Sequence, residues 1–262
     1  MVPRVHAWHP DVPGLREVYH ARFDHAYPMH THENWAVMLV DDGAVAYGLD
    51  REVHHAVPTM LTLLPPGVPH DGRPAVAGSD YRKRVLYLEP EWLPVPAQNL
   101  AIRRPTLDPP AARLAKRVHA ALDEPGDLMA AEHWLLTLRE SILRHLGAPA
   151  RMPHDKPLAR RLREMLDARV TESFTIASAA ADLGAHPSHL VRVFSQTYGL
   201  APHQYLIGRR IDLARRLLVD GHRPAEAAVL SGFHDQSHLT RHFRRVLGVT
   251  PAMLVAQPSA AA

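Results

Sequence analysis

The sequence predicts an α+β multidomain protein with an N-terminal antiparallel β-barrel, a helical hairpin and a C-terminal all-α domain that holds two helix-turn-helix motifs. Three observations lead to this prediction. Short apolar or alternating segments separated by turn residues fill positions 15–90. Apolar residues at helical spacing follow from Pro109. A helix-turn-helix pattern then occurs twice near the C-terminus. The expected ranges are 1–106 for the barrel, 107–147 for the hairpin, 148–157 for a linker and 158–262 for the helical domain.

The composition excludes several classes of site. The chain has 262 residues, of which 46% are hydrophobic and 22% are charged, a balance typical of globular proteins. Cysteine is absent, which excludes a disulfide framework, a thiol nucleophile, an iron–sulfur cluster and a cysteine zinc finger. No apolar run approaches the roughly 18 residues of a membrane span, and the first residues lack the apolar core of a signal peptide. We therefore expect a cytoplasmic protein with no membrane partner.

The charge is divided between the two halves of the chain. Residues 1–155 carry 16 Lys and Arg against 19 Asp and Glu, whereas residues 156–262 carry 14 against 8. Clustered arginines neutralise phosphates, so a basic second half is compatible with a nucleic-acid partner. A solvated basic surface is the plainer alternative, and the charge alone does not decide between the two.

The first half divides into strands and then helices. We expect strands at 19–23, 35–40, 45–49, 59–64 and 84–88. Turn residues such as Asp41-Asp42-Gly43 separate them, and many short strands at regular spacing are typical of a small barrel or sandwich. Two apolar helical patterns follow, from 114 to 122 and from 134 to 146. Three prolines within residues 148–157 then indicate an interdomain linker.

The second half repeats itself at an offset of 49 residues. Residues 188–202 and 237–251 share seven identities in the pattern S-H-L-x-R-x-F-x-x-x-x-G-x-x-P. Each copy begins with a short helix, at 175–183 and 225–231, followed by a turn that contains glycine. Pro187 suits the first position of the next helix, and Asp235 is the expected N-cap of its counterpart.

Each second helix presents a polar face opposite an apolar stripe, as a reader of the DNA major groove requires. The candidate DNA-binding residues are Ser188, His189, Arg192, Gln196, Gln236, Ser237, His238, Arg241 and Arg244. A single polar face is as often only solvated, but two copies in a basic domain favour contacts with bases and phosphates. Between the copies, we expect residues 202–218 to form one long helix, and roughly 18 helical residues span about 27 Å. That length could hold the two readers near one DNA helical turn apart, about 34 Å.

These C-terminal motifs resemble the AraC/XylS family of bacterial transcription regulators over about 100 residues. The segment 210–218 is similar to the family's linker helix, and 232–251 is similar to its signature. His234 and Leu254 depart from the usual residues. The resemblance implies a double-stranded DNA operator as partner, RNA polymerase as a further partner if the protein activates, and a homodimer formed through the helices of residues 109–147. It favours Arg192, Gln196, Gln236, Ser237 and Arg241 as DNA contacts.

Histidines in the first half resemble the two metal-site motifs of the cupin barrel. His30 and His32 would share one face of a strand, and Pro65 to His70 fits P-x-G-x-x-H. With His70, they could bind one divalent Zn, Ni, Fe or Mn ion with open positions for a ligand. The Glu that cupins place about four residues after the second His is missing, so a barrel without metal stays open. Trp35 and Tyr47 are the candidate effector-binding residues.

The leading prediction is a sequence-specific DNA-binding transcription regulator controlled by a small-molecule effector in a cupin-like N-terminal barrel. The alternative is a metal-dependent cupin enzyme, an isomerase or oxygenase, fused to a DNA-binding domain. The sequence contains no G-x-x-x-x-G-K loop and no G-x-S-x-G motif, so we expect no enzymatic activity. The effector, the operator sequence and the choice between activation and repression stay open.

Overall fold

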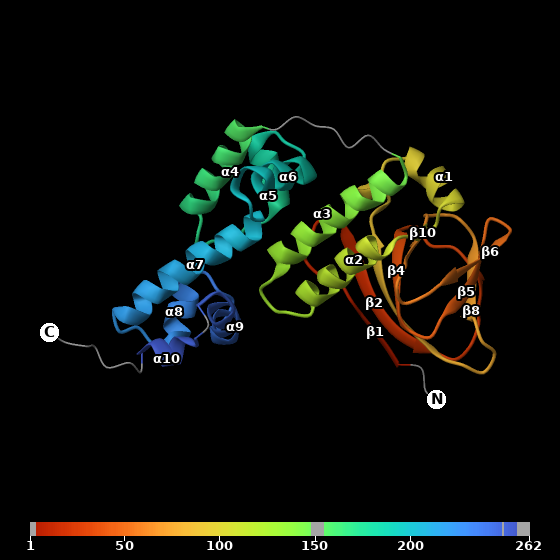
Figure 1. Ribbon diagram of the computed structural model, residues 1–262, viewed down its shortest axis with the longest axis horizontal. Helices are drawn as coiled ribbons and strands as arrows, with labels where there is room; N and C mark the ends of the chain where they lie inside the picture. Colours follow the sequence, from red (N-terminus) through yellow and green to blue (C-terminus); the bar gives the residue numbers. More distant parts are fainter. Residues whose placement is uncertain (1–3, 148–154, 248, 256–262) are drawn as a thin grey trace. The chain divides into compact units, whose positions relative to one another are not determined.

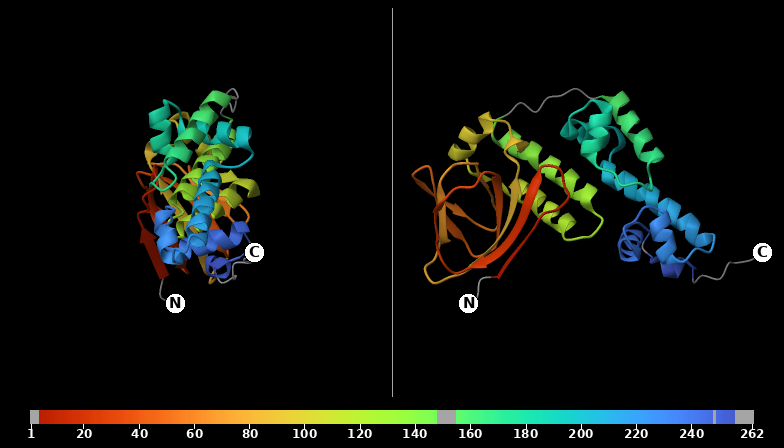
Figure 2. Two further views of the ribbon diagram at one scale, coloured as in Figure 1. Left: turned by 90° about the vertical axis from the view of Figure 1, so that its left-hand side faces the viewer. Right: turned by 180° about the vertical axis from the view of Figure 1, so that it is seen from behind.

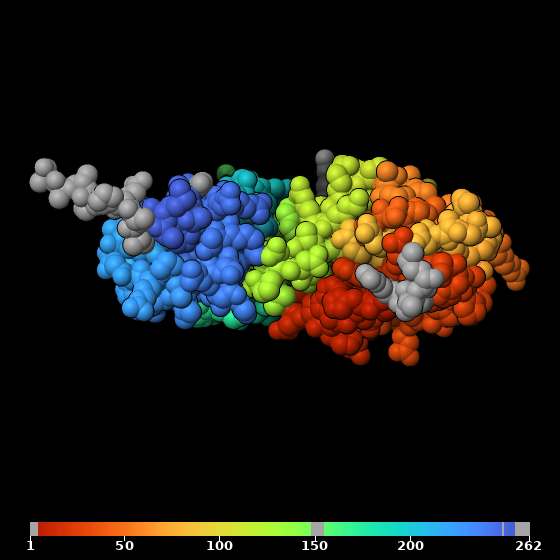
Figure 3. Space-filling view, turned by 90° about the horizontal axis from the view of Figure 1, so that it is seen from below, coloured from red at the N-terminus to blue at the C-terminus, as the bar shows by residue number. Residues whose placement is uncertain are grey.

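The computed structural model describes residues 4–147, 155–247 and 249–255 (Figure 1). Residues outside these ranges are grey in the surface view of Figure 3. The chain forms two compact units, one from residues 1–120 and 134–151 and the other from residues 121–133 and 152–262. The predicted linker lies mostly outside the described residues, and its last two residues, Lys156 and Pro157, begin helix α4.

The first unit is built on two antiparallel sheets. Its strands are β1 (Arg4–Trp8), β2 (Leu15–Phe23), β3 (Tyr27–His30), β4 (Trp35–Asp42), β5 (Val45–Leu49), β6 (Glu52–Ala56), β7 (Leu61–Leu64), β8 (His70–Pro74), β9 (Tyr81–Leu88) and β10 (Thr106–Leu107). One sheet has the order β1-β2-β9-β4-β7-β10 and the other has the order β3-β8-β5-β6. The five predicted strands are all present, and the predicted β-barrel with a separate helical domain is confirmed.

The core of this unit lies between the two sheets. Strand β4 shows why the sequence folds this way: its apolar run from Trp35 to Val40 is buried throughout, as expected for a central strand. Met38 and Val40 pack with Val45 and Tyr47 of the other sheet in one apolar cluster. The helices η1 (Pro90–Trp92), α1 (Pro96–Arg103), α2 (Pro109–Leu122) and α3 (Leu128–His145) complete the unit, and the parts of α2 and α3 that belong to it lie beside the strands (Figure 2).

The structure corrects one local prediction. His30 and His32 do not share a strand, because His30 ends β3 and His32 lies in the connection to β4. Thr31 to Asn34 break the strand with polar residues, so the two-residue alternation does not apply there. Strand pairing instead places His30 directly opposite His70, the first residue of β8.

The second unit is helical. Its helices are α4 (Lys156–Ala168), α5 (Ile176–Leu183), α6 (Pro187–Tyr198), α7 (Pro202–Val219), α8 (Pro224–Leu230), α9 (Gln236–Leu247) and α10 (Pro251–Val255). The pairs α5–α6 and α8–α9 are the two helix-turn-helix motifs, and α7 joins them. Figure 3 shows the surface of α7 to α10 as one continuous blue area. No helix in the described ranges is long and apolar enough to cross a bilayer.

Local signals set the bounds of these helices as predicted. Gly184 adopts a left-handed φ of 62° at the end of α5, which frees the chain to turn. Pro187 occupies the first turn of α6. The carboxylate of Asp235 accepts a 2.7 Å hydrogen bond from the backbone N–H of His238 and so caps α9.

Candidate functional site

The helices α6 and α9 each bury an apolar stripe and leave most of their polar residues accessible. Leu190, Phe194, Leu239 and Phe243 are fully buried in the helical unit. Of the nine candidate DNA-binding residues, Gln196, Gln236, Ser237 and Arg244 are exposed, His189, Arg192 and Arg241 are half-buried, and Ser188 and His238 are buried. The structure therefore brings seven accessible candidates onto two helices, and their contact with DNA stays a prediction.

A hydrogen bond orients Arg192 on α6. Its guanidinium Nη2 donates to Nδ1 of His189, three residues earlier, at 2.8 Å. Burial and the charge of Arg192 both lower the pKa of His189, so the imidazole is a neutral acceptor. This pair fixes a cation on the accessible face of α6.

Arg241 on α9 is held by two carboxylates. The connection between α2 and α3 runs from residue 123 to residue 127 and contains Glu124 and Asp127. Arg241 Nη1 donates to Glu124, and Arg241 Nη2 donates to Asp127 Oδ2 at 3.0 Å. A guanidinium binds paired carboxylates with the same fork of donors that it offers to phosphate. Two acidic side chains are therefore bound to the guanidinium that we expect to contact DNA.

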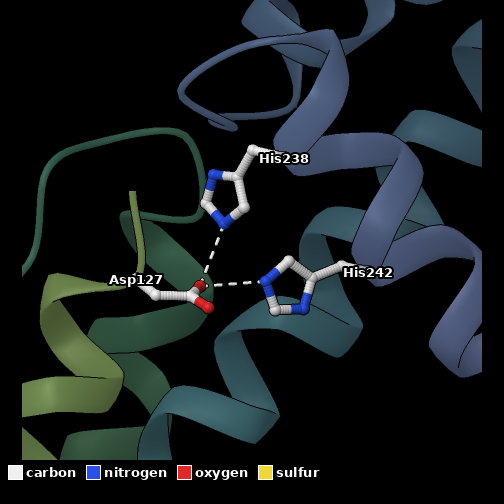
Figure 4. A group of neighbouring side chains, drawn as sticks. All are labelled: Asp127, His238 and His242. Atoms are coloured by element: carbon white, nitrogen blue, oxygen red, sulfur yellow. Dashed lines mark hydrogen bonds and ion pairs between the residues drawn. The ribbon is translucent and has the colours of Figure 1, made fainter. Parts of the chain in front are cut away.

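Asp127 also binds two imidazoles (Figure 4). Its Oδ1 atom lies 3.0 Å from His238 Nε2 and 2.9 Å from His242 Nε2. Burial raises the pKa of Asp127, but the hydrogen bonds from His238 and His242 and the charge of Arg241 outweigh burial, and the pKa falls well below its ordinary value. Asp127 is therefore a carboxylate at neutral pH.

A second acidic side chain caps the first helix-turn-helix motif. Glu132 is buried, and its carboxylate accepts hydrogen bonds from the backbone N–H groups of Ile176 and Ala177 at 2.6 and 2.7 Å. These are free donors at the start of α5, where the helix dipole favours a negative charge. Burial raises the pKa of Glu132, and the two backbone bonds only partly offset that effect.

Sequence reasoning missed Glu124, Asp127 and Glu132. Their partners lie 44 to 117 residues away along the chain, so no local motif could identify them. The visible signal was a group of acidic residues, from Asp123 to Asp127, interrupting two helical patterns in a chain whose second half is basic. That pattern indicates a surface loop equally well.

The barrel contains a small cavity of about 40 Å³, enough for about two or three water molecules. Its walls are Tyr27, His30, His32, Ala36, Met38, Val45, Tyr47, Leu64, His70, Asp71, Gly72, Tyr81, Lys83, Val85 and Tyr87. Lys83 supplies a cation, with Nζ 4.5 Å from the centre of the Tyr27 ring. Burial lowers the pKa of Lys83 to about 8. Among the described residues, no carboxylate pairs with this ammonium group within 4.0 Å.

The three predicted metal ligands meet in this cavity. The His70 ring centroid lies 4.5 Å from that of His30 and 4.7 Å from that of His32. Each Nδ1 atom lies 2.7 to 3.0 Å from a backbone carbonyl oxygen, which fixes Nδ1 as the donor and leaves Nε2 with its lone pair. Burial lowers the pKa of His32, and it lowers the pKa of His70 to about 4. Neutral imidazoles can bind a metal through Nε2, but the ligand atoms of these three rings do not all lie within 4.8 Å of one another, and the His30 and His32 ring centroids are 6.3 Å apart. Binding of the predicted ion therefore stays a prediction.

The two candidate effector-binding residues lie in different places. Tyr47 is part of the cavity wall, with its ring stacked on His54 at 5.3 Å between centroids. Trp35 is not part of that wall, and its indole N–H donates to the carbonyl of Pro90 at 3.1 Å. Binding of an effector by either residue stays a prediction.

Comparison with known proteins agrees with both halves. An AraC-like ligand binding domain matches residues 13–138, and a helix-turn-helix domain matches residues 179–257. The chain is 29% identical over 127 residues to an uncharacterized HTH-type transcriptional regulator, YbfI, from Bacillus subtilis, covering 47% of this chain and 46% of that protein. It is 38% identical over 80 residues to a putative AraC-like transcription regulator from Streptomyces antibioticus, covering 30% of this chain and 26% of that protein.

A solved structure with similarity to this chain is the DNA-binding domain of AdpA, a global transcriptional factor, in complex with a target DNA. It is 34% identical, with a TM-score of 0.35, over 39% of this chain and 92% of that one. The matched stretches span less than half the length of the curated relatives named above. With an AraC-like ligand-binding domain followed by a helix-turn-helix domain, the chain belongs to the AraC family of transcriptional regulators.

Proposed function

We propose that this chain is a sequence-specific DNA-binding transcription regulator whose DNA binding or activation is controlled by a small molecule bound in its N-terminal barrel. The observation that carries the proposal is the pair of helix-turn-helix motifs, α5–α6 and α8–α9, joined by one 18-residue helix. A helix of that length spans about 27 Å. That span is close to one turn of B-DNA, about 34 Å, so α6 and α9 suit successive major grooves.

Arg192 on α6 and Arg241 on α9 provide the test of DNA binding. Each is the repeated arginine of its motif, and a bidentate contact with a base is worth about 1–3 kcal/mol. Replacing either residue with Ala should weaken binding to a selected duplex by roughly five- to 150-fold. Exposed Arg160 on α4, changed to Ala, controls for the loss of one positive charge. Unchanged affinity in both recognition-helix variants would remove the basis of the proposal.

The α2–α3 connection provides a means of control. Because Glu124 and Asp127 both accept hydrogen bonds from the guanidinium of Arg241, DNA must displace these carboxylates before Arg241 can contact it. The same connection is continuous with α2, and α2 contacts the barrel where His119 Nδ1 lies 3.2 Å from His20 Nε2 on β2. An effector that favours one arrangement of β2 and α2 would change how firmly the acidic residues hold Arg241.

The chemistry of the barrel cavity suggests a class of effector. We propose a small molecule with an anionic or hydrogen-bond-accepting group, because Lys83 lacks a carboxylate partner among the described residues and tyrosine and histidine side chains surround it. Thermal shift with a panel of small carboxylates tests this assignment. A carboxylate that raises the melting temperature of the wild-type chain should no longer raise it in Lys83→Met. It should still raise it in Lys116→Met, which changes an exposed lysine of α2. Equal shifts in both variants would place the ligand elsewhere.

A metal ion in the same cavity is the second candidate feature. Its support is that Nε2 of His30, His32 and His70 is free of the backbone bonds made by Nδ1. These residues would hold one divalent ion and leave coordination positions open to a ligand. An enzymatic role needs in addition a catalytic acid or base and turnover of a substrate. We propose a sensor, because the matched curated relatives are named as transcriptional regulators.

The remaining partners are proposed from the family. A homodimer through α2 and α3, and contact with RNA polymerase if the protein activates, would suit a regulator that binds paired half-sites. A DNA-binding regulator acts where the chromosome is, so we propose the bacterial cytoplasm as its location. Light scattering after size exclusion at micromolar concentration tests the dimer, and a monomer alone would contradict it.

A further inference from the structure

Asp127, His238 and His242 bring three metal-ligating atoms to one point (Figure 4). His238 and His242 lie four residues apart on α9, so their side chains leave the same face of the helix. Asp127 is the last residue of the α2–α3 connection and belongs to the same compact unit as α9. Its Oδ1 and the two Nε2 atoms all lie within 4.8 Å of one another, and no other such group occurs in the described ranges.

The distances come close to those around a transition metal. Zinc bonds to imidazole nitrogen and carboxylate oxygen are about 2.0–2.2 Å long, so neighbouring ligands around a tetrahedral ion lie about 3.3–3.6 Å apart. Asp127 Oδ1 lies 2.9 and 3.0 Å from the two Nε2 atoms, so the side chains need to open by only a few tenths of an ångström to admit the ion. Two imidazoles with one carboxylate form a ligand set used by zinc and by other divalent first-row ions, with positions left for water.

The surroundings favour ligands held in place before the ion arrives. Both imidazoles are buried, and the Asp127 side chain is only 14% exposed. Asp127 Oδ2 accepts from Arg241, which leaves Oδ1 directed at the histidines. Glu124 pairs with the same arginine and offsets its charge beside a cation. Such outer contacts orient metal ligands and raise affinity.

The metal-free hydrogen bonds show what binding must replace. The backbone N–H of His234 donates to His238 Nδ1 at 3.3 Å, so Nε2 of this ring carries the hydrogen that it donates to Asp127. An ion at Nε2 moves that hydrogen to Nδ1 and breaks the 3.3 Å bond. The ion also replaces the hydrogen bonds from both imidazoles to Asp127 Oδ1, and it displaces Arg241 Nη2 from its 3.4 Å contact with His242 Nε2. Bonds from all three ligand atoms to one cation compensate for these losses.

We propose that Asp127, His238 and His242 form a site for one zinc-class divalent cation, bound through Oδ1 of Asp127 and Nε2 of both histidines. The ion would fasten the α2–α3 connection to α9 and keep Glu124 and Asp127 beside Arg241. On the proposed function, metal occupancy then opposes DNA binding by α9. The metal site itself does not depend on that function and is tested without DNA.

The test is Co²⁺ binding by the full chain, without an affinity tag and after treatment with a chelator. Native mass spectrometry counts the bound ions, and visible absorption reports their coordination by nitrogen and oxygen. The chain has 20 histidines, so differences between variants decide the result. His30→Gln removes a predicted ligand of the barrel ion. A loss of Co²⁺ in this variant would therefore report the barrel and not the site on α9. Asp127→Asn and His242→Gln test the site directly, and Asp123→Asn and His234→Gln are their matched controls.

We expect Asp127→Asn and His242→Gln each to lose one Co²⁺ per chain or to bind it at least tenfold more weakly, with a matching loss of absorption. Asp123→Asn, His234→Gln and His30→Gln should retain that ion. Co²⁺ should also raise the melting temperature of the wild-type chain more than that of Asp127→Asn, an isosteric change that is suited to preserving the fold. The proposal is overturned if Asp127→Asn and His242→Gln bind as many ions, with the same affinity, as their controls.

Discussion

Converting Glu124 and Asp127 to their amides should tighten DNA binding, because both carboxylates hold the guanidinium of Arg241. The Glu124 pair is more than one-third exposed on both sides and is worth about 0.5 kcal/mol after solvent screening. The Asp127 side chain is 14% exposed, so its bond to Arg241 is worth about 1–1.5 kcal/mol. Releasing both should increase DNA affinity about tenfold, and up to about 30-fold.

The assay is fluorescence anisotropy of a duplex selected by the full chain from a random library, at one fixed salt concentration. Removing two negative charges also strengthens attraction to any DNA, so the control must remove two charges as well. Asp123→Asn with Asp220→Asn does so at two exposed positions, the first in the same connection. Thermal melting confirms that both double variants are folded. If the Glu124→Gln/Asp127→Asn chain binds no more tightly than the control, these carboxylates do not restrain Arg241 and the reasoning is refuted.

Three further predictions concern stability. Gly232→Ala should lower the free energy of unfolding of the helical unit by about 2–4 kcal/mol, because φ is 83° and a Cβ would lie 2.8 Å from Thr171 Cα. Its control is Gly221→Ala, where φ is 94° but a Cβ would meet open space. In the same urea titration, this control should lower the free energy of unfolding by about 1 kcal/mol. Glu132→Ala should cost about 2–4 kcal/mol by leaving two N–H groups of α5 without acceptors, and Glu132→Gln, which keeps an amide oxygen, should cost clearly less; equal losses would exclude the capping role. Burial, and then the charges of Arg84 and His20, hold the pKa of His119 well below 6.5, so below pH 6.5 the unfolded chain binds a proton that the folded chain does not bind. The stability that this group contributes is therefore complete above pH 6.5 and declines below it. The free energy of unfolding of His119→Gln should decline less steeply between pH 7 and 5 than that of the wild-type chain.

The sequence anticipated the helix-turn-helix motifs because their signals are local. Gly184 has the left-handed φ of a C-cap, and Asp235 accepts the capping bond that its position suggests. The apolar stripes were predicted less completely. Val246 and Leu247 extend the period of Leu239 and Phe243, yet they are 52% and 40% exposed near the end of α9. Helical periodicity gives the face of a residue, but not whether another element covers that face.

The barrel was predictable in class but not in detail. Strands β3 (Tyr27–His30) and β8 (His70–Pro74) each contain a proline, and β10 has only two residues, so none of them shows the run of apolar or alternating residues that predicts a strand. His30 and His32 were placed on one strand, whereas the structure brings them to His70 through pairing and a connecting turn. The three histidines line one cavity because of strand pairing and a turn, and not because of alternation along a strand.

The contacts of the α2–α3 connection were beyond sequence reasoning. Glu124 and Arg241 are 117 residues apart, and His238 has the polar character of a DNA contact although it is buried against Asp127. Nothing in a single sequence identifies which acidic residue meets which basic residue when both lie on amphipathic or loop segments.

Selection of duplexes from a random DNA library by the full chain tests the central claim most directly. We predict enrichment of a site with two half-sites centred about 10 base pairs apart, because α7 holds α6 and α9 close to one helical turn apart. Repeating the selection with Arg192→Ala should relax the preference in one half-site, and Arg241→Ala should relax it in the other. A selection that enriches no sequence, or a preference that neither variant changes, would contradict the assignment of α6 and α9 as the DNA-reading helices.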